Sequence, residues 1–282
     1  MTSIGTINRL RVNRAVDFGV YLDGDDLGEI LLPRRYMPAN CKVGDELDVF
    51  IYVDSDDRLI ATTETPKARV GECAYLKVVA VNSIGAFLDW GLPKDLLVPF
   101  AEQQQRMEVG RFYTVYVYCD EQTDRIAASS KLSHYLHEKN PQEKHQQLKP
   151  QQAVNLLICA RTELGFKAVI DNHSLGMIFH ADVLQPLRSG QTLRGFVKDV
   201  RDDGKINLCL QLQNQAARDE LAEKILQHLA SNKGISTLTD KSTPEEIYRQ
   251  YRVSKASYKK AIGNLFRQQK IRIEAEQIEL RS

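Results

Sequence analysis

Hydrophobic and polar residues alternate in short runs along the first three quarters of the chain. Between residues 46 and 53, for example, the apolar side chains of Leu47, Val49 and Ile51 occupy every second position. A period of two places such side chains on one face of an extended strand. Glycines interrupt the runs at Gly19 and Gly44, where bends or bulges are expected. The pattern therefore predicts a succession of short β-strands joined by tight turns.

The runs repeat as three blocks with the same order of features. Two glycine landmarks carry the repeat, one in an apolar turn near the start of each block and one before a long strand. Both landmarks shift by 66 residues between the first two blocks and by 80 between the second and third; they are Gly19, Gly85 and Gly165, and Gly44, Gly110 and Gly190. A shared offset at two positions indicates an internal repeat. Five short strands in about 65 residues, with glycines at the bends, predict a small closed β-barrel in each block.

After residue 212 the hydrophobic period changes to that of a helix. A helix is predicted over 217–229, with a buried face made of Leu221, Ile225, Leu226 and Leu229. Gly234 follows as a stop signal.

Two further helices follow in the sequence. Thr243, Pro244 and Glu246 have the spacing of a capping box with proline in the first turn, so a second helix is predicted to begin there. Ser254 is the expected cap of a third helix that runs to about residue 269. Its predicted buried stripe consists of Tyr258, Ala261, Ile262, Leu265 and Phe266.

The last residues complete a recognisable order of elements. Ile271, Ile273, Ile278 and Leu280 alternate around a polar turn, which predicts a hairpin. Three helices followed by a two-stranded hairpin is the order of a winged helix. The expected fold is therefore multidomain β plus α: three tandem closed five-stranded barrels and a winged helix. The expected limits are 1–66, 67–132 and 151–212 for the barrels, 133–150 for a linker and 213–282 for the winged helix.

Composition narrows the class of protein. The chain has 282 residues, of which 43% are hydrophobic and 27% charged, as in ordinary globular domains. It has no apolar run long enough to cross a bilayer and no apolar signal core at its start, so a cytoplasmic protein is expected. The five cysteines are isolated and form no Cys-x-x-Cys pair. We therefore expect no metal site, no disulfide framework and no cofactor.

Charge is distributed unevenly although the whole chain carries only +1. Residues 1–66 contain 7 Lys and Arg against 12 Asp and Glu, whereas residues 215–282 contain 13 against 9. A polyanion would therefore be attracted to the C-terminal part and repelled by the first block.

The three blocks resemble the S1 RNA-binding domain, an OB-fold barrel, over about residues 1–212. The third block is the most similar. Its Gly-Met-Ile-Phe-His stretch at 176–180 looks like the family's Gly-Leu-Val-His stretch, and Asp-Gly-Lys-Ile at 203–206 looks like its acidic turn followed by Gly-Arg-Ile. The resemblance implies that bases stack on aromatic side chains beside the repeated glycine while cations attract the backbone.

Aromatic residues fill these positions in the first two blocks only in part. Phe18 and Tyr21 match both positions in the first block, and Phe87 matches the second position in the second block, where Ile84 replaces the first. The alternative is that such rings only fill the barrel ends. That structural interpretation is favoured for the strand tyrosines Tyr52, Tyr116 and Tyr118.

The third block offers cations and a histidine. Leu164 and Lys167 occupy the two aromatic positions, with Phe166 shifted by one. His180 fills the family's histidine position, and Lys205 fills its basic position after the last glycine. We expect Phe166 to offer stacking area, His180 to stack or donate a hydrogen bond, and the two lysines to contact phosphate.

The third predicted helix and its flanks are strongly basic. Residues 254–273 contain no acid and six cations, namely Lys255, Lys259, Lys260, Arg267, Lys270 and Arg272. This is the electrostatic pattern of a nucleic-acid-binding helix, although a solvated face that packs against protein is the alternative. The acids at Glu274, Glu276 and Glu279 argue against insertion of the hairpin into a minor groove.

The whole chain resembles the bacterial CvfB/YitL family, also called conserved virulence factor B. The resemblance rests on the three barrels and on two stretches of the C-terminal domain, residues 240–247 and 253–263. Lys-Lys-Ala-Ile-Gly at 259–263 is the most specific part. The resemblance implies an RNA-binding, post-transcriptional regulator with a C-terminal winged helix.

The leading hypothesis is a non-catalytic protein that binds single-stranded RNA across the third barrel and the winged helix. The sequence contains no phosphate-binding loop, zinc-protease motif, nucleophile elbow or dinucleotide fingerprint. One alternative is a DNA-binding transcription factor that uses its winged helix, which a preference for duplex DNA would favour. Another is a scaffold that contacts ribosome or polymerase proteins through the acidic first barrel, which retention of a protein but no nucleic acid would favour.

Overall fold

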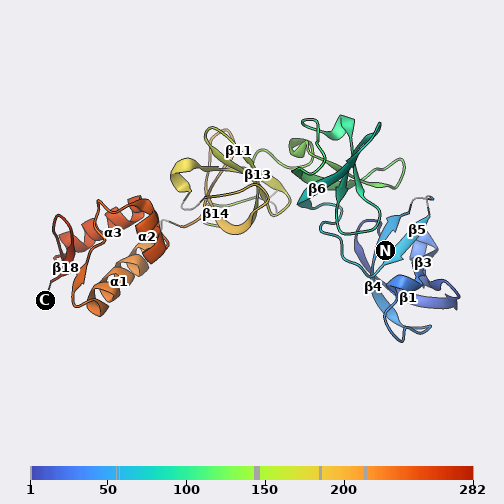
Figure 1. Cartoon of the computed structure of the whole chain (residues 1–282), viewed down its shortest axis with the longest axis horizontal. Coiled ribbons are helices and arrows are strands. Elements are labelled where there is room, and N and C mark those ends of the chain that lie inside the picture. Colours follow the sequence, from blue (N-terminus) through green and yellow to red (C-terminus); the bar gives the residue numbers. More distant parts are fainter. Residues whose placement is uncertain are drawn as a thin grey trace. The chain divides into compact units, whose positions relative to one another are not determined.

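The computed structural model describes residues 2–54, 56, 58–142, 147–183, 186–212 and 215–281 (Figure 1). It divides into two compact units. One consists of Met1–His137 with Asn172–Ser174, and the other of Glu138–Asp171 with Leu175–Ser282.

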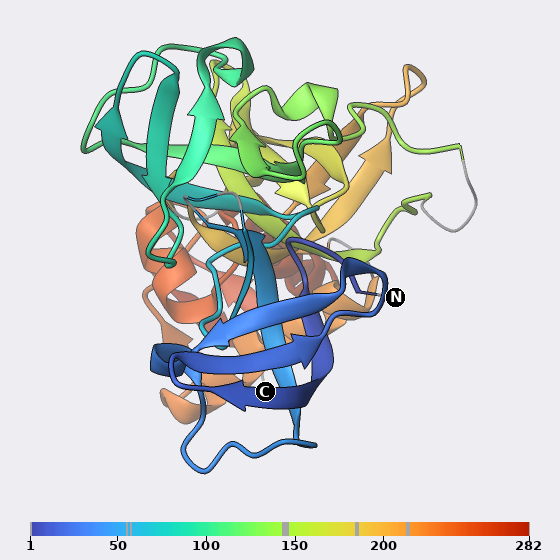
Figure 2. The ribbon, with the colours of Figure 1, turned by 90° about the vertical axis from the view of Figure 1, so that its right-hand side faces the viewer.

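The first barrel is a closed sheet in the order β1, β2, β3, β5, β4. Its strands are β1 (Ile7–Val16), β2 (Gly19–Asp23), β3 (Glu29–Pro33), β4 (Glu46–Val53) and β5 (Leu59–Thr62). All neighbouring strands run antiparallel except β3 and β5, which are parallel. Figure 2 shows these strands curving around one another.

The second and third barrels repeat this strand order. The second contains β6 (Cys73–Val81), β7 (Gly85–Asp89), β8 (Leu96–Pro99), β9 (Phe112–Cys119) and β10 (Ile126–Ser129). The third contains β11 (Ala153–Arg161), β12 (Gly165–Ile170), β13 (Ser174–Phe179), β14 (Thr192–Val200) and β15 (Ile206–Cys209). The repeated topology confirms the predicted three five-stranded barrels. The domain limits remain a prediction.

The first glycine landmark is required by a close approach of two strands. A Cβ atom at Gly19 would lie 2.2 Å from the carbonyl oxygen of Leu32 on the next strand. The corresponding distances are 2.3 Å at Gly85 and 2.0 Å at Gly165. Any side chain would push these strands apart, so the repeat seen in the sequence is imposed by barrel closure.

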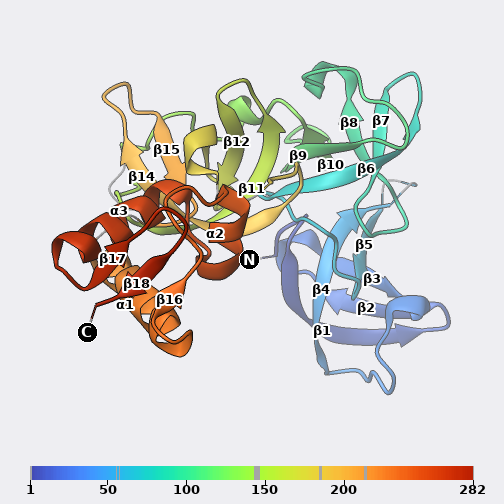
Figure 3. The ribbon, with the colours of Figure 1, turned by 60° about the vertical axis from the view of Figure 1, so that its left-hand side comes forward.

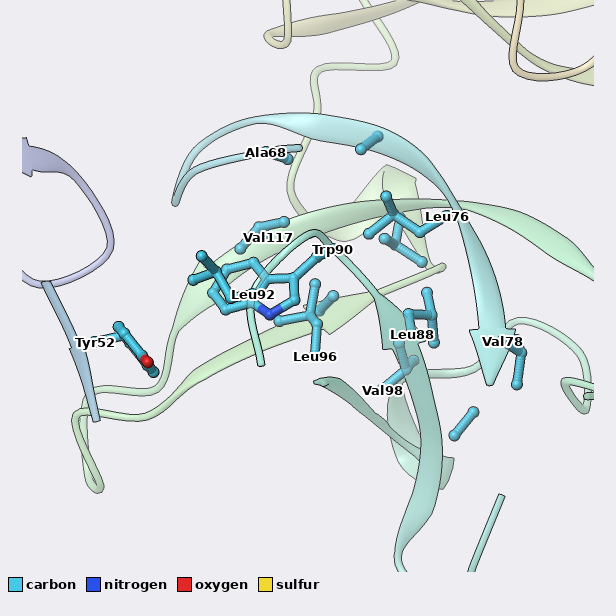
Figure 4. Packing of buried hydrophobic residues seen from close by; sticks show 14 of the residues in the cluster. Tyr52, Ala68, Leu76, Val78, Leu88, Trp90, Leu92, Leu96, Val98 and Val117 are labelled. Atoms are coloured by element: carbon cyan, nitrogen blue, oxygen red, sulfur yellow. The ribbon is translucent and has the colours of Figure 1, made fainter. Parts of the chain in front are cut away.

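The first two barrels share part of their cores. Phe50 and Tyr52 of the first barrel are at most 4% exposed and belong to the same buried cluster as Trp90 and Leu92 of the second (Figure 4). The ring of Phe50 meets that of Trp90 edge to face, with centroids 5.7 Å apart. Tyr52 is therefore a core residue, as the structural interpretation of its alternating position predicts. The two barrels form one packed unit.

The C-terminal domain has the predicted winged-helix order with one addition. Its helices are α1 (Gln215–Ser231), α2 (Pro244–Tyr251) and α3 (Lys255–Arg267), and its hairpin consists of β17 (Ile271–Ile273) and β18 (Ile278–Leu280). A further short strand, β16 (Ile235–Ser236), pairs with β18 and completes a three-stranded sheet (Figure 3).

The helical core follows the sequence pattern at most positions. Leu221, Ile225 and Leu229 of α1 are at most 5% exposed and pack with α3 residues such as Tyr258. Phe266, predicted in the buried stripe of α3, is instead 51% exposed. Tyr258, Ala261, Ile262 and Leu265 already complete the stripe, and Phe266 falls beyond its edge. Among the residues described, no helix is long and apolar enough to cross a membrane.

Candidate nucleic-acid interface

A shallow cavity of about 250 Å³ lies on the outer side of the third barrel. Lys167 on β12, Arg201 and Lys205 bring three cations to its wall. Met177 and Phe179 of β13 contribute apolar area to the same wall. The cavity also includes Glu138, Leu164, Leu175, Gly176, Ile206 and Asn207. Cations beside apolar and aromatic area are what a nucleotide chain needs for phosphate attraction and base stacking.

Strand pairing explains why residues distant in sequence meet there. Met177 lies opposite Asn207 in the parallel pair of β13 and β15. Asn207 also lies opposite Asp199 of β14, and its Nδ2 donates a hydrogen bond to the Asp199 Oδ1 at 2.7 Å. The alternation of each strand sends these side chains outward while their neighbours fill the core. Lys167 and Lys205, two predicted phosphate contacts, are therefore brought into one cavity.

Phe166 is a correction to the sequence-based assignment. It is 7% exposed and belongs to the core of the third barrel. Because Lys167 faces outward, the period of two turns its neighbour Phe166 inward, where no base can stack on it. Phe166 instead supports His180, whose ring it meets edge to face at a centroid distance of 5.8 Å.

His180 is exposed at the start of a short 3₁₀ helix, His180–Asp182. Its backbone N–H donates to the carbonyl oxygen of Leu164 at 3.1 Å, which ties the helix to the tip of the β11–β12 hairpin. Lys198 anchors the other end, with its Nζ 2.8 Å from an Asp182 carboxylate oxygen. That hydrogen bond raises the pKa of Lys198. His180 is thus held on a fixed support, facing solvent.

Phe179 is the aromatic residue of this face that sequence reasoning missed as a site residue. It is half-buried and borders the cavity from β13, the strand beside β12. The first two barrels have prolines, Pro33 and Pro99, at the end of the corresponding strands. The repeated aromatic positions lie beside the glycine at the start of β12. The repeat therefore did not indicate an aromatic ring at the end of the next strand, β13.

Glu138 brings a negative charge to the same cavity. Its Oε1 lies 3.6 Å from the Nζ of Lys167, and both side chains are substantially exposed. The next residue, Lys139, packs against Gly204, and Asn140 donates its backbone N–H to the Gly204 carbonyl at 2.7 Å. The predicted linker therefore contributes one edge of the cavity.

The corresponding face of the first barrel is occupied by its own side chains. Phe18 is 58% exposed at the hairpin tip. The guanidinium of Arg14 lies 3.9 Å from the centre of the Tyr21 ring, where a base would stack. Arg14 also pairs with Glu29 at 2.8 Å. This hydrogen bond holds the pKa of Glu29 below its usual value.

In the second barrel, too, an arginine covers an aromatic ring of this face. Ile84 is 55% exposed at the hairpin tip, and Phe87 is half-buried on β7. Phe100 takes the place that His180 has in the third barrel, since its N–H donates to Ile84 as that of His180 does to Leu164. The Arg106 guanidinium lies 4.0 Å from the centre of the Phe100 ring. Two of the three barrels therefore have an arginine on an aromatic ring of this face.

The predicted cations of the winged helix lie on or just after α3. Lys259, Lys260, Arg267 and Lys270 are exposed, and Lys255 is half-buried. Lys255 donates to the carbonyl oxygen of Lys241 at 3.3 Å, and Lys259 lies 3.7 Å from Asp240. The ion pair of Lys259 with Asp240 is exposed, and such pairs are weak and exchange readily with other anions. The helix therefore presents Lys259 and Lys260 to solvent and does not bury them against its own core.

The described residues contain no group of three or more His, Cys, Asp or Glu side chains that could hold a metal ion.

Two domain models and several related proteins match this chain, and together they cover most of its length. The S1 domain model matches residues 4–64 and 70–131, and the CvfB-like winged helix domain model matches residues 223–280. YitL of Bacillus subtilis (strain 168) is 30% identical over 272 residues, which cover 93% of this chain and 88% of that protein. Conserved virulence factor B of Staphylococcus aureus (strain USA300) is 25% identical over 249 residues, covering 85% and 80%. A crystal structure of a multidomain protein with nucleic acid binding domains from Streptococcus pneumoniae TIGR4 aligns over 99% of this chain and 98% of that one, with 24% identity and a TM-score of 0.41.

Proposed function

This chain belongs to the family of YitL and conserved virulence factor B, and we propose that it binds single-stranded RNA as a non-catalytic regulator acting after transcription in the cytoplasm. The first two barrels match the S1 domain model and the C-terminal domain matches a winged-helix model, and both are nucleic-acid-binding types of domain. The observation that carries the choice of surface is the cavity on the third barrel, where Lys167 and Lys205 stand beside Met177 and Phe179.

Each group of this cavity has a separate role in the proposed complex. Phe179 and Met177 offer the flat apolar area on which an unpaired base stacks. Lys167 and Lys205 contact phosphates, and an incoming phosphate replaces the Glu138 carboxylate near Lys167. Exposed His180 adds a ring or a hydrogen-bond donor at the edge. Lys255, Lys259, Lys260, Arg267 and Lys270 of the winged helix provide further phosphate contacts.

The arginines on the first two barrels support the choice of the third. Arg14 covers Tyr21, and Arg106 covers Phe100, so a base must displace a cation before it can stack there. The first block also carries an excess of five acidic residues over basic ones, which opposes binding of a polyanion. We therefore expect a smaller contribution to RNA binding from the predicted aromatic residues of the first two barrels, Phe18, Tyr21 and Phe87.

Charge reversal on the cavity tests this proposal. Lys205→Glu should weaken binding of single-stranded RNA by the full-length protein and reduce the slope of log K against log salt by about 0.7 for the lost phosphate contact. Lys42→Glu is the matched control, because it changes the net charge equally at an exposed site of the first barrel. Fluorescence anisotropy over a salt series measures both quantities. Equal affinities and slopes for the two variants would contradict the proposed surface.

A DNA-binding transcription factor is the second candidate, favoured by the basic α3. Competition between single-stranded RNA and duplex DNA of the same length separates the two functions. Our proposal predicts that the RNA displaces the duplex at equal concentration.

A further inference from the structure

A groove of about 410 Å³ opens on the C-terminal domain near the ends of α1 and β18, two elements that Figure 3 shows in this domain. Leu226 and Ala230 of α1 lie one helical turn apart on its wall. Leu280, the last residue of β18, completes the apolar part of the wall. The other lining residues are Gln227, Lys270 and Arg281.

The apolar wall continues the core of this domain beyond the point where its own side chains cover it. Ile278 and Leu280 are two positions apart on β18 and so lie on one face of the strand. Ile278 is fully buried in the core cluster, whereas Leu280 is 38% exposed. Ala230, on the last turn of α1, is exposed and contributes only a methyl group. The core therefore ends in an open apolar surface.

Two cations border this groove. The backbone N–H of Arg281 donates to the carbonyl oxygen of Lys270 at 2.9 Å, which holds the two residues side by side. Both residues are exposed, and none of the described residues that line the groove is acidic. Cations at the rim of an apolar surface favour a partner of opposite charge. The groove is therefore complementary to an acidic partner.

The lining favours a protein segment over a nucleotide chain. Unpaired bases bind proteins by stacking on aromatic rings, and the described lining residues include no aromatic side chain. Aliphatic side chains such as Leu226 and Leu280 pack instead against the apolar residues of an amphipathic helix. The small side chain of Ala230 lets such a helix approach α1 closely, because the distance between packed helices depends on the side chains at their contact.

From these observations we infer that the groove binds an acidic amphipathic helix of a partner protein. The apolar residues of that helix, spaced three and four positions apart, contact Leu226, Ala230 and Leu280. Its carboxylates pair with Lys270 and Arg281. The groove thus gives the winged helix a protein-binding surface in addition to the proposed binding of RNA.

Two glutamate variants of the full-length protein test the groove. Ala230→Glu places a carboxylate in the wall, whereas Ser231→Glu adds the same charge at the next exposed position of α1, outside the lining. The probe is a fluorescein-labelled amphipathic helix of leucine and glutamate, about 18 residues or five turns long. Ala230→Glu should weaken its binding at least about 10-fold, because like charges then meet in the interface. Ser231→Glu is the matched control and should bind like the wild type.

Reversal of a rim charge gives a second, kinetic readout. Arg281→Glu should slow association of the acidic probe several-fold, and the effect should shrink at high salt, because rim charges act mainly on association. A counterpart peptide with lysine in place of every glutamate should bind the wild type more weakly than the acidic probe. Lys270 is left unchanged, since the proposed function also gives it a phosphate contact.

Stopped-flow anisotropy measures association and affinity, and thermal unfolding checks that the glutamate variants are equally folded. Equal affinities of Ala230→Glu and Ser231→Glu, or no preference of the wild type for the acidic probe, would overturn the inference. A wild-type dimer that only Ala230→Glu dissociates would assign the groove to a second copy of the chain instead. Loss of single-stranded RNA binding in Ala230→Glu alone would assign it to RNA. The peptide measurements contain no RNA, so the proposed function stands or fails separately.

Discussion

At the scale of single residues, the repeated glycines show how directly the barrel geometry constrains the sequence. Gly19, Gly85 and Gly165 each allow a strand to touch the carbonyl group of its neighbour, at distances no Cβ atom can share. Gly263 has open space around it. Glycine is therefore required by barrel closure in three places, whereas no neighbouring atom requires it in the fourth.

Alanine substitutions should separate a glycine that closes a barrel from one that does not. Gly85→Ala forces a Cβ atom to within 2.3 Å of the Val98 carbonyl oxygen. We expect the second barrel to lose roughly 3 kcal/mol, the upper part of the range for overpacking. Gly263→Ala, by contrast, should not lower stability. Urea unfolding of the full chain, followed through amide exchange in β6–β10, measures the difference, and similar stability of the two variants would contradict the close-approach argument.

The residue scale also shows which side chains of this face the sequence placed on the surface correctly and which it did not. Lys167 was chosen because it follows the repeated glycine Gly165, and Lys205 because it fills the basic position of the S1 resemblance; the structure brings both to one cavity. Phe166 was misplaced by one position, which in a strand means the opposite face. Phe179 could not be chosen, because its meeting with Lys167 and Lys205 depends on strand pairing, which the sequence of one strand does not contain.

At the scale of elements, the start of α2 follows the sequence closely. Thr243 accepts a hydrogen bond from the Glu246 N–H at 3.3 Å, and its own N–H donates to the Glu246 carboxylate at 2.8 Å. Pro244 occupies the first turn. The predicted capping box is confirmed. Local signals of this kind need only neighbouring residues, so the sequence displays them fully.

Loss of this cap should destabilise the winged helix. Thr243→Ala removes the acceptor for the Glu246 N–H, and we expect a cost of about 1 kcal/mol. Thermal unfolding of the C-terminal transition in the full chain measures it. Lys241→Ala, at an exposed position two residues before the cap, should cost less; an equal loss in both variants would argue against the cap.

The same cap predicts a dependence on pH. Hydrogen bonds from the backbone and side chain of Thr243 hold the pKa of Glu246 below its ordinary value of 4.5. A lowered folded pKa means that the stabilisation is present above pH 4.5 and is lost as pH falls through the folded value. Stability of the winged helix measured from pH 7 to 3 should therefore fall less steeply in Glu246→Gln than in the wild type. Glu245→Gln, which lacks the cap contact, should keep the steeper fall.

Elements that depend on distant partners were harder to predict. The hairpin of β17 and β18 was expected from its alternating residues, and the structure confirms it. Strand β16 was missed, because two residues, Ile235 and Ser236, carry no periodicity and become a strand only by pairing with β18. Phe266 was assigned to the core because an apolar residue at helical spacing usually packs inward.

At the scale of the whole molecule, the first two barrels share a core that the repeat did not predict. A repeat indicates similar units but not which of them pack together. Lys94 of the second barrel donates to the carbonyl oxygens of Val53 and Asp54 of the first, both at 2.8 Å. With Phe50 against Trp90, this contact packs two repeats into one unit, which we expect to unfold cooperatively.

A substitution in the first barrel should therefore be felt in the second. Phe50→Ala should cost about 3–5 kcal/mol and speed amide exchange in β6–β10 as well as in β1–β5. Leu156→Ala, in the core of the third barrel, should leave exchange in β1–β10 unchanged. Hydrogen exchange of the full chain reports both. Normal protection of β6–β10 in Phe50→Ala would show that the two barrels fold independently.

The distribution of charge along the chain agrees with RNA binding by the C-terminal half and not by the first barrel. The acidic first block has its own arginine on Tyr21, whereas the third barrel and α3 expose lysines beside apolar or aromatic side chains. The account therefore places RNA on the C-terminal half of the chain.

Ultraviolet crosslinking in cells, followed by sequencing of the bound RNA and mapping of the crosslinked peptides, tests this claim most directly. The account predicts RNA attached to peptides that contain Lys167, Phe179, Lys205 or Lys259. Crosslinks confined to the first two barrels, or to DNA alone, would contradict it.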